Sequence, residues 1–166
     1  MKHITTALGA LALSTSLAQA GGVERAATNI GFMFEKGNYA ELSFGSVTPS
    51  VSGTQLLPAF GTFAGAKSGN MAKRYTTSSL ALKTQLNDKL SFGLLLDQPI
   101  GADVSYAPST GYLYGGITGT EAKITSSAVT ALLRYKLGDN VSVYAGPKFE
   151  SAKGTMRLFN GYTLTT

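Results

Sequence analysis

The sequence has 166 residues, with 14 Lys and Arg against nine Asp and Glu, and it contains no cysteine. Disulfides are therefore excluded, and the mild positive charge includes no basic run of the kind that binds nucleic acid. Only 14 % of the residues are charged, against about a quarter in a typical soluble domain, and eight Tyr and eight Phe stand without any Trp. This composition favours a sheet with one face that meets something other than water.

Residues 1–20 have the features of a cleaved export signal. Met1-Lys2-His3 is a short basic start, residues 4–17 carry no charge, and Ala18-Gln19-Ala20 matches the A-x-A cleavage pattern. The apolar run is shorter than the ~20 residues that a membrane-spanning helix needs. We therefore expect export and cleavage after Ala20.

Most of the remaining chain alternates large apolar residues with small or polar ones, which is typical of strands with one apolar face. Helical spacing is limited to the stretch from Val23 to Asn29, which could form a turn or two. The predicted strands are 38–47, 78–86, 89–97, 127–137 and 141–150, with a shorter sixth at about 155–159.

The connections between these strands fall into two classes. Tight turns are predicted near 87–88 and 138–140, and long loops near 48–74 and 98–122. Short turns at one end and long loops at the other are typical of bacterial outer-membrane barrels, whose turns face the periplasm. A soluble secreted β-sandwich also alternates and also has tight turns, but the low charge and the long loops favour the barrel.

A membrane barrel also gives a physical reason for the alternation. In hydrocarbon every backbone polar group needs an internal partner, so strands survive only in a closed barrel, with apolar residues facing lipid and polar ones facing the lumen. The sequence predicts that Leu133, Tyr135 and Leu137 face lipid. Five or six strands cannot close a barrel, since the smallest have about eight. Residues 38–166 are therefore interpreted as an incomplete transmembrane antiparallel β-barrel.

Three stretches carry a resemblance to a known family. They are "FEKGNYAELSFG" at 34–45, "LNDKLSFGLLLDQPIGADVSY" at 86–106 and "SSAVTALLRYKLGDNVSVYAGPKFESAKGTM" at 126–156. Together they resemble the N-terminal part of the FadL/TodX-type (OMPP1) outer-membrane transporters of long-chain fatty acids and hydrocarbons. The most telling element is the order of a turn, a strand and a P-x-G-x-x-x-x-Y motif, formed by Asn87, Asp88, Pro99, Gly101 and Tyr106.

The resemblance implies a fourteen-stranded barrel with an N-terminal hatch inside its lumen. It also implies passive passage of substrate through the barrel and exit through a lateral opening into the membrane, with no cofactor. Residues 21–37 would form the hatch, although this segment is short and lacks the family's "NPA"-type motif. The chain is accordingly interpreted as the first part of a longer transporter.

Catalytic chemistry is not expected in the mature chain. The single histidine, His3, lies in the predicted signal, and without His or Cys the Ser-His-Asp, Cys-His and usual zinc sites are unavailable. We therefore predict that the protein is not an enzyme and holds no metal or cofactor.

Candidate substrate contacts fall into three groups. Phe32 and Phe34 could contact an alkyl chain or pack against the barrel wall, and Phe60 and Phe63 could form an entry surface or pack within their loop. The lumenal cations Lys83, Arg134 and Lys136 could hold a fatty-acid carboxylate, although charged lumen residues are common in barrels without being sites.

The sequence thus predicts outer-membrane transport of hydrophobic compounds, with long-chain fatty acids as the expected class. The expected partners are hydrophobic small molecules and outer-membrane lipid, without nucleic acid, and the barrel is expected to be monomeric when complete. The alternative is a small complete outer-membrane barrel with a structural or envelope-stabilising role.

Overall fold

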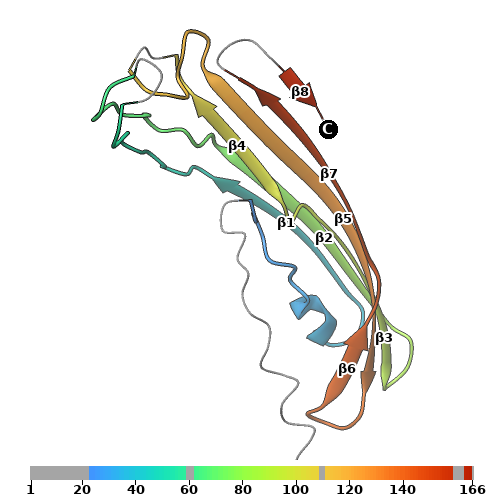
Figure 1. The fold of residues 1–166 in the computed structure, drawn as a ribbon. Coiled ribbons are helices and arrows are strands. Elements are labelled where there is room, and N and C mark those ends of the chain that lie inside the picture. Colours follow the sequence, from blue (N-terminus) through green and yellow to red (C-terminus); the bar gives the residue numbers. More distant parts are fainter. Residues whose placement is uncertain (1–22, 59–61, 109–110, 159–162, 166) are drawn as a thin grey trace, which may run out of the picture.

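The computed structural model describes residues 23–58, 62–108, 111–158 and 163–165, so the predicted signal and Phe60 lie outside the described residues. One antiparallel sheet carries most of the regular structure (Figure 1). Its strands are β1 (Tyr39–Val47), β2 (Tyr75–Gln85), β3 (Leu90–Asp97), β4 (Gly101–Tyr106), β5 (Thr120–Lys136), β6 (Ser142–Ala145), β7 (Lys148–Arg157) and β8 (Thr163–Thr165). A short 3-10 helix, η1 (Gly31–Phe34), precedes β1. Within these ranges no helix has the length and apolar character needed to cross a membrane.

The strands follow one another across the sheet in the order β1-β2-β3-β5-β7-β8. Both β4 and β6 pair with β5, so β3 and β4 share one position in the sheet and β6 and β7 share another. Two tight turns are closed by bonds from Leu86 N–H to Leu90 O at 2.9 Å and from Leu137 N–H to Val141 O at 2.9 Å. The all-β fold is confirmed, and the described residues form eight strands, rather than five or six, that occupy six positions across the sheet.

Three features differ from the sequence prediction. The expected loop at 98–122 contains β4. Pro99 and Gly101 interrupt the alternation in the sequence, but the chain after them still pairs with β5. The expected sixth strand at 155–159 is instead the end of β7, which pairs with β5 without a break from Lys148 to Arg157. The stretch from Val23 to Asn29 contains no helix, and Glu24 forms a β-bridge with Ile100.

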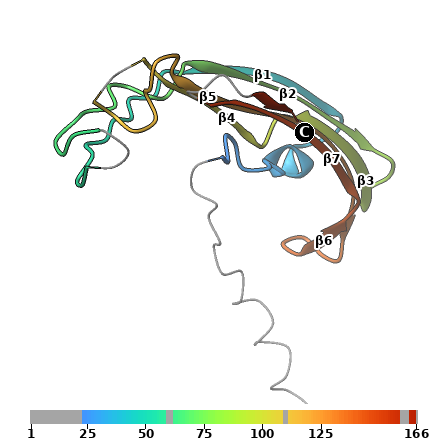
Figure 2. The same ribbon diagram turned by 45° about the horizontal axis from the view of Figure 1, so that its top comes forward.

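The sheet curves over residues 23–37, called the N-terminal segment below, so that η1 lies on the concave side (Figure 2). The concave face carries small and polar residues such as Ala81, Lys83 and Ser91, all buried. The convex face carries large apolar residues that stay exposed, including Phe44 at 78 % and Phe149 at 71 %. An uncovered apolar face of this size is expected where a barrel wall meets lipid.

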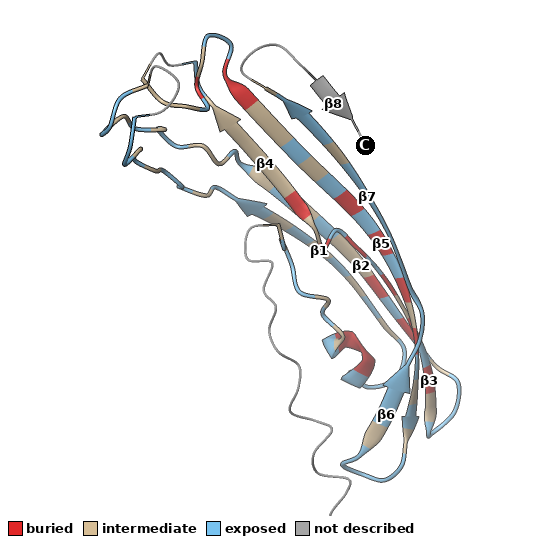
Figure 3. Ribbon diagram, viewed as in Figure 1, coloured by how far each residue is buried: buried red, intermediate tan, exposed pale blue. Residues whose placement is uncertain are grey.

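The core lies between η1 and the concave face (Figure 3). It is formed by Phe32, Met33, Ala81, Leu95 and Leu132. Met33 is completely buried. The apolar packing of the described residues therefore fixes the N-terminal segment against the wall.

The polarity of the sheet inverts along β5. On the convex face, Leu133 and Val129 are followed toward the long loops by Ser127, Lys123 and Glu121. On the concave face, Arg134 and Thr130 are followed by Ile124 and Ala122. An outward surface that changes from apolar to charged marks the upper boundary of the hydrocarbon region, because charge is costly within it.

Candidate functional site

Two of the predicted lumenal cations hold the N-terminal segment in place. Lys83 Nζ donates to the carbonyl oxygens of Glu35 at 2.9 Å and Gly37 at 2.6 Å. Arg134 Nη1 donates to the Met33 carbonyl oxygen at 2.7 Å, and its guanidinium lies 4.4 Å from the centre of the Phe34 ring. These bonds satisfy carbonyls around the end of η1 with donors from the opposing wall.

The predicted contact residues separate into two groups. Phe32, Phe34, Lys83 and Arg134 meet at η1, where Phe32 is buried and Phe34 half-exposed. Lys136 also lies on the concave side of β5, two residues beyond Arg134. Phe63 is exposed in the first long loop. This loop lies at the opposite end of the sheet from η1 (Figure 1). Their role as substrate contacts stays a prediction.

The motif residues occupy structural positions. Asn87 Oδ1 accepts from the N–H groups of Lys89 at 2.9 Å and Leu90 at 2.8 Å, which fixes the first turn, and Asp88 is exposed within it. Pro99 and Gly101 lie between β3 and β4. Tyr106 ends β4 and stacks on Tyr112, with ring centres 5.7 Å apart.

A gap opens between β2 and the chain that links β3 to β4. Pairing of β2 with β3 stops at Leu80 opposite Leu96. It resumes only where Lys73 N–H donates to Asp103 O at 2.9 Å and Ala72 bridges Val104. The strand gap is defined by residues 74–79 on one side and 97–102 on the other, and no β-pair between these two described ranges joins them.

A bulge against β5 causes the gap. Asp97 stands opposite Ala128 and Gly101 opposite Thr125, so Gln98, Pro99 and Ile100 face only Ser126 and Ser127. The extra residue bends the strand and breaks its ladder, and Pro99 has no N–H to donate. The link therefore cannot pair with both neighbouring strands.

The polar groups of the bulge find other partners. Arg25 N–H donates to Pro99 O at 2.8 Å, and Gly101 N–H donates to Val23 O at 2.7 Å. Ser126 Oγ accepts from Ile100 N–H at 2.8 Å and donates to Ile100 O at 2.7 Å. The N-terminal segment and one serine thus replace the missing ladder bonds, as buried backbone groups require.

Arg25 fixes the N-terminal segment at the gap. A Cβ at position 101 would clash with the Arg25 side chain, so glycine leaves room for Arg25 in this conformation. The Arg25 guanidinium lies 4.2 Å from the centre of the Tyr75 ring on β2. The segment therefore contacts both sides of the strand gap.

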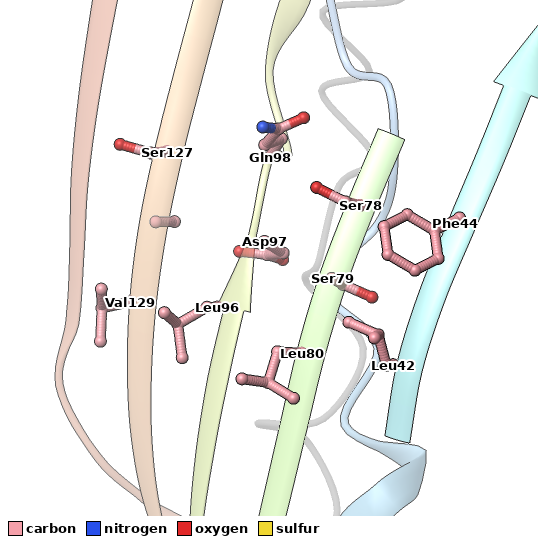
Figure 4. Close-up of a pocket in the computed structure, with 11 residues that line it drawn as sticks. Leu42, Phe44, Ser78, Ser79, Leu80, Leu96, Asp97, Gln98, Ser127 and Val129 are labelled. Atoms are coloured by element: carbon pink, nitrogen blue, oxygen red, sulfur yellow. The ribbon is translucent and has the colours of Figure 1, made fainter. Parts of the chain in front are cut away.

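A cavity of about 320 Å³ lies in the gap (Figure 4). Its lining combines convex-face residues with concave-face residues. The former include Leu42, Phe44, Leu80, Leu96 and Val129, and the latter include Ser79, Asp97 and Ala128. Two further hollows, of about 550 Å³ and 440 Å³, continue along β2, and Gln98 lines all three. Residues of both faces of the sheet therefore line the hollow at the gap.

A family model described as outer membrane protein transport protein (OMPP1/FadL/TodX) matches residues 3–166. The chain belongs to this family. Searches of the curated proteins and of the solved structures found no match. As a FadL/TodX member the protein belongs to an outer-membrane family that transports hydrophobic molecules, and this is a family of transporters, not enzymes. Among the described residues, no cluster of three His, Cys, Asp or Glu could hold a metal.

The roles of several residues of this FadL/TodX site could not be predicted from the sequence. Met33 and Gly93 meet in the core, and Ser126 and Gln98 shape the gap, yet none lies in a recognisable motif. The available signal was Pro99 with Gly101, because a proline inside an alternating strand indicates a bulge or an edge. The register of the bulge depends on β5, which is remote in sequence.

Proposed function

We propose that this protein passes hydrophobic compounds passively across the outer membrane and releases them sideways, through the strand gap, into the bilayer. Long-chain fatty acids are the proposed substrate class. The supporting observation is the cavity that lines up Asp97 and Ser79 of the lumenal face with Leu80, Leu96 and Val129 of the lipid face.

The chemistry of the gap suits an alkyl chain. Its outward rim is apolar, and each methylene that moves into hydrocarbon gains about 0.8 kcal/mol. Transfer into the bilayer therefore needs no chemical energy source. The Ser126 hydroxyl and the N-terminal segment satisfy the bulge backbone, which lowers the cost of an opening at membrane depth.

The path toward the gap would begin among the long loops. There the concave face is apolar, with Val104 and Ile124, and the ring centre of Tyr106 lies 5.3 Å from that of Tyr114. An alkyl chain could leave water at this surface. Further along, beyond the gap, a carboxylate would reach the level of Lys83 and Arg134, which already bind the N-terminal segment, and then Lys136, two residues beyond Arg134.

We also propose that the N-terminal segment is the hatch of this transporter, and that residues 1–20 are cleaved before it folds. The segment covers the concave face with the buried Phe32 and Met33, and it reaches the gap through Arg25. N-terminal sequencing of protein recovered from outer membranes would test the cleavage, with Gly21 as the expected first residue.

Filling the cavity tests the exit route. In cells that lack the gene, the plasmid-borne protein should restore oleate uptake, and Ser78→Trp should reduce it several-fold by placing an indole on the cavity lining. The matched control is Thr84→Trp, an exposed position on the same strand and face, opposite Phe92 and away from the cavity. Equal uptake by both variants would refute lateral exit here, and no restoration by the unmodified protein would refute oleate as a substrate.

A further inference from the structure

A band of cations lies on the convex face, between the apolar band and the long loops. Its members are Lys73, Arg74, Lys123, Lys153 and Arg157, all exposed. Two carboxylates accompany them, those of Asp103 and Glu121. Cations therefore outnumber carboxylates on this surface, called the cationic band below.

The carboxylates of the band are already engaged. Glu121 pairs with Lys73 at 3.3 Å and with Arg157 at 3.1 Å. Asp103 stands directly opposite Lys123 in the strand register. Lys153 stands opposite Thr125 on β5, so neither carboxylate is its direct cross-strand neighbour.

Three cations of the band are close to one another, and two of them, Lys123 and Arg157, share the carboxylates of Asp103 and Glu121. Lys123 is opposite Thr155, so Lys153 and Arg157 are its two diagonal neighbours on β7. Diagonal neighbours in a sheet are separated by about 7–8 Å, within reach of long side chains, and like charges at such positions repel. A bound anion would relieve this repulsion, and a phosphate accepts from several Lys or Arg donors at once.

The height of the band indicates where that anion lies. Next to the tight turns, the apolar convex residues of β5 and its turn run from Leu137 to Val129. This stretch is about 26 Å long at ~3.3 Å per residue, and at the usual strand tilt it spans ~20 Å along the membrane normal. Lys123 lies six residues further along β5, about 35 Å above Leu137 and hence ~10 Å beyond an apolar band of the usual height of ~25 Å. The phospholipid headgroup zone extends only about 5–8 Å from the hydrocarbon.

The direction of the band follows from the connections. The tight turns lie at the opposite end of the sheet, and in outer-membrane barrels such turns face the periplasm. The cationic band therefore faces the outer leaflet. An anion at this height, on a lipid-facing wall, belongs to a lipid whose phosphates are carried on a tall sugar headgroup.

We propose that the cationic band binds the phosphorylated sugar headgroup of an outer-leaflet glycolipid of the lipopolysaccharide class. Its acyl chains would lie against the apolar convex residues below, and its phosphates would accept from Lys123, Lys153 and Arg157. A hollow of about 260 Å³ over β4, β5 and β7 could hold one phosphate, because its three cations, Lys73, Lys123 and Arg157, outnumber its two carboxylates, Asp103 and Glu121.

The test uses the full-length gene product purified in a zwitterionic detergent. Three lipids are added separately: lipopolysaccharide, the same lipid after phosphatase treatment, and phosphatidylglycerol. The amount retained through gel filtration and the temperature of the heat-modifiable gel shift are measured. The unmodified protein should bind lipopolysaccharide at least about fivefold more tightly than the dephosphorylated lipid or phosphatidylglycerol.

The double variant Lys123→Gln/Lys153→Gln should lose this preference, whereas Lys123→Arg/Lys153→Arg should keep it. The control Lys67→Gln/Lys89→Gln removes the same charge from two exposed positions outside the band and should behave as the unmodified protein. Equal binding of the phosphorylated and dephosphorylated lipids by the unmodified protein would by itself overturn the proposal. Equal or tighter binding of phosphatidylglycerol, or no loss in the folded Gln variant, would overturn it as well.

Discussion

Met33 fills the space that any side chain at Gly93 would need. A Cβ at position 93 would clash with the Met33 thioether and would lie 2.8 Å from the Phe32 ring. Gly93 also stands opposite Lys83 on β2 and Leu132 on β5. Its backbone, without a side chain, is therefore the surface of the sheet against which η1 packs.

We therefore expect Gly93→Ala to unseat the N-terminal segment. Overpacking of this kind costs about 1–3 kcal/mol, and moving η1 away is easier than deforming three hydrogen-bonded strands. Limited proteolysis should cut the variant near Phe34 several-fold faster than the unmodified protein. Gly138→Ala is the matched control, because a Cβ there meets no atom within 4 Å. Equal cleavage of Gly93→Ala and the control would contradict a docked segment.

The two wall cations should act together on the same segment. Lys83→Met removes donors to Glu35 and Gly37, and Arg134→Met removes the donor to Met33. A hydrogen bond from a charged group contributes about 1.5–3 kcal/mol. Each variant should therefore raise the proteolysis rate of the segment and the entry of a bulky antibiotic.

Lys136→Met is the control for this pair, since no bond of its side chain to the N-terminal segment occurs in the described part of the chain. If it opened the segment as strongly as Arg134→Met, loss of lumenal charge would be the cause rather than loss of specific bonds. The double variant Lys83→Met/Arg134→Met should exceed either single variant, because the two side chains hold different carbonyls.

Period-two alternation predicted most of the strands and the faces of their residues, because each residue's side of a sheet is set locally, but it missed β4. Lys83 and Arg134 were placed together on the polar face of their strands, and in the structure both lie on the concave face. Their partners could not be predicted, because Arg134 and Met33 are 101 residues apart. The strand gap was missed for the same reason, since the extra residue at Gln98–Ile100 exists only relative to the register with β5.

The bulge itself should depend on Ser126. Its hydroxyl binds both the N–H and the C=O of Ile100, so Ser126→Ala would leave two partly buried backbone groups without this partner. Each such group costs about 1–3 kcal/mol. We expect a clearly lower temperature of the heat-modifiable gel shift. Ser127→Ala, at the next residue but exposed on the convex face, should leave this temperature unchanged. A similar loss in both variants would show that the Ile100 bonds are not the cause.

Glu121 should give the cationic band a pH dependence. The hydrogen bond from Lys73, followed by the charges of Lys73 and Arg157, lowers the pKa of the Glu121 carboxyl, which lies beyond the apolar band. A carboxyl with a lowered pKa stabilises the fold above its unfolded pKa, and this contribution is lost as the pH falls through the folded value. The ion pairs are exposed, so the effect is small.

Glu121→Gln should therefore unfold at a lower temperature than the unmodified protein at pH 7, and the difference should shrink toward pH 3. The control Asp88→Asn removes an exposed carboxylate in the first turn and should show no such convergence. Glycolipid binding gives an independent readout, because Glu121→Gln frees Lys73 and Arg157 for phosphate. Tighter lipopolysaccharide binding by Glu121→Gln at pH 7 is expected. Weaker binding would mean that Glu121 orients these two cations for the phosphate instead of competing with it.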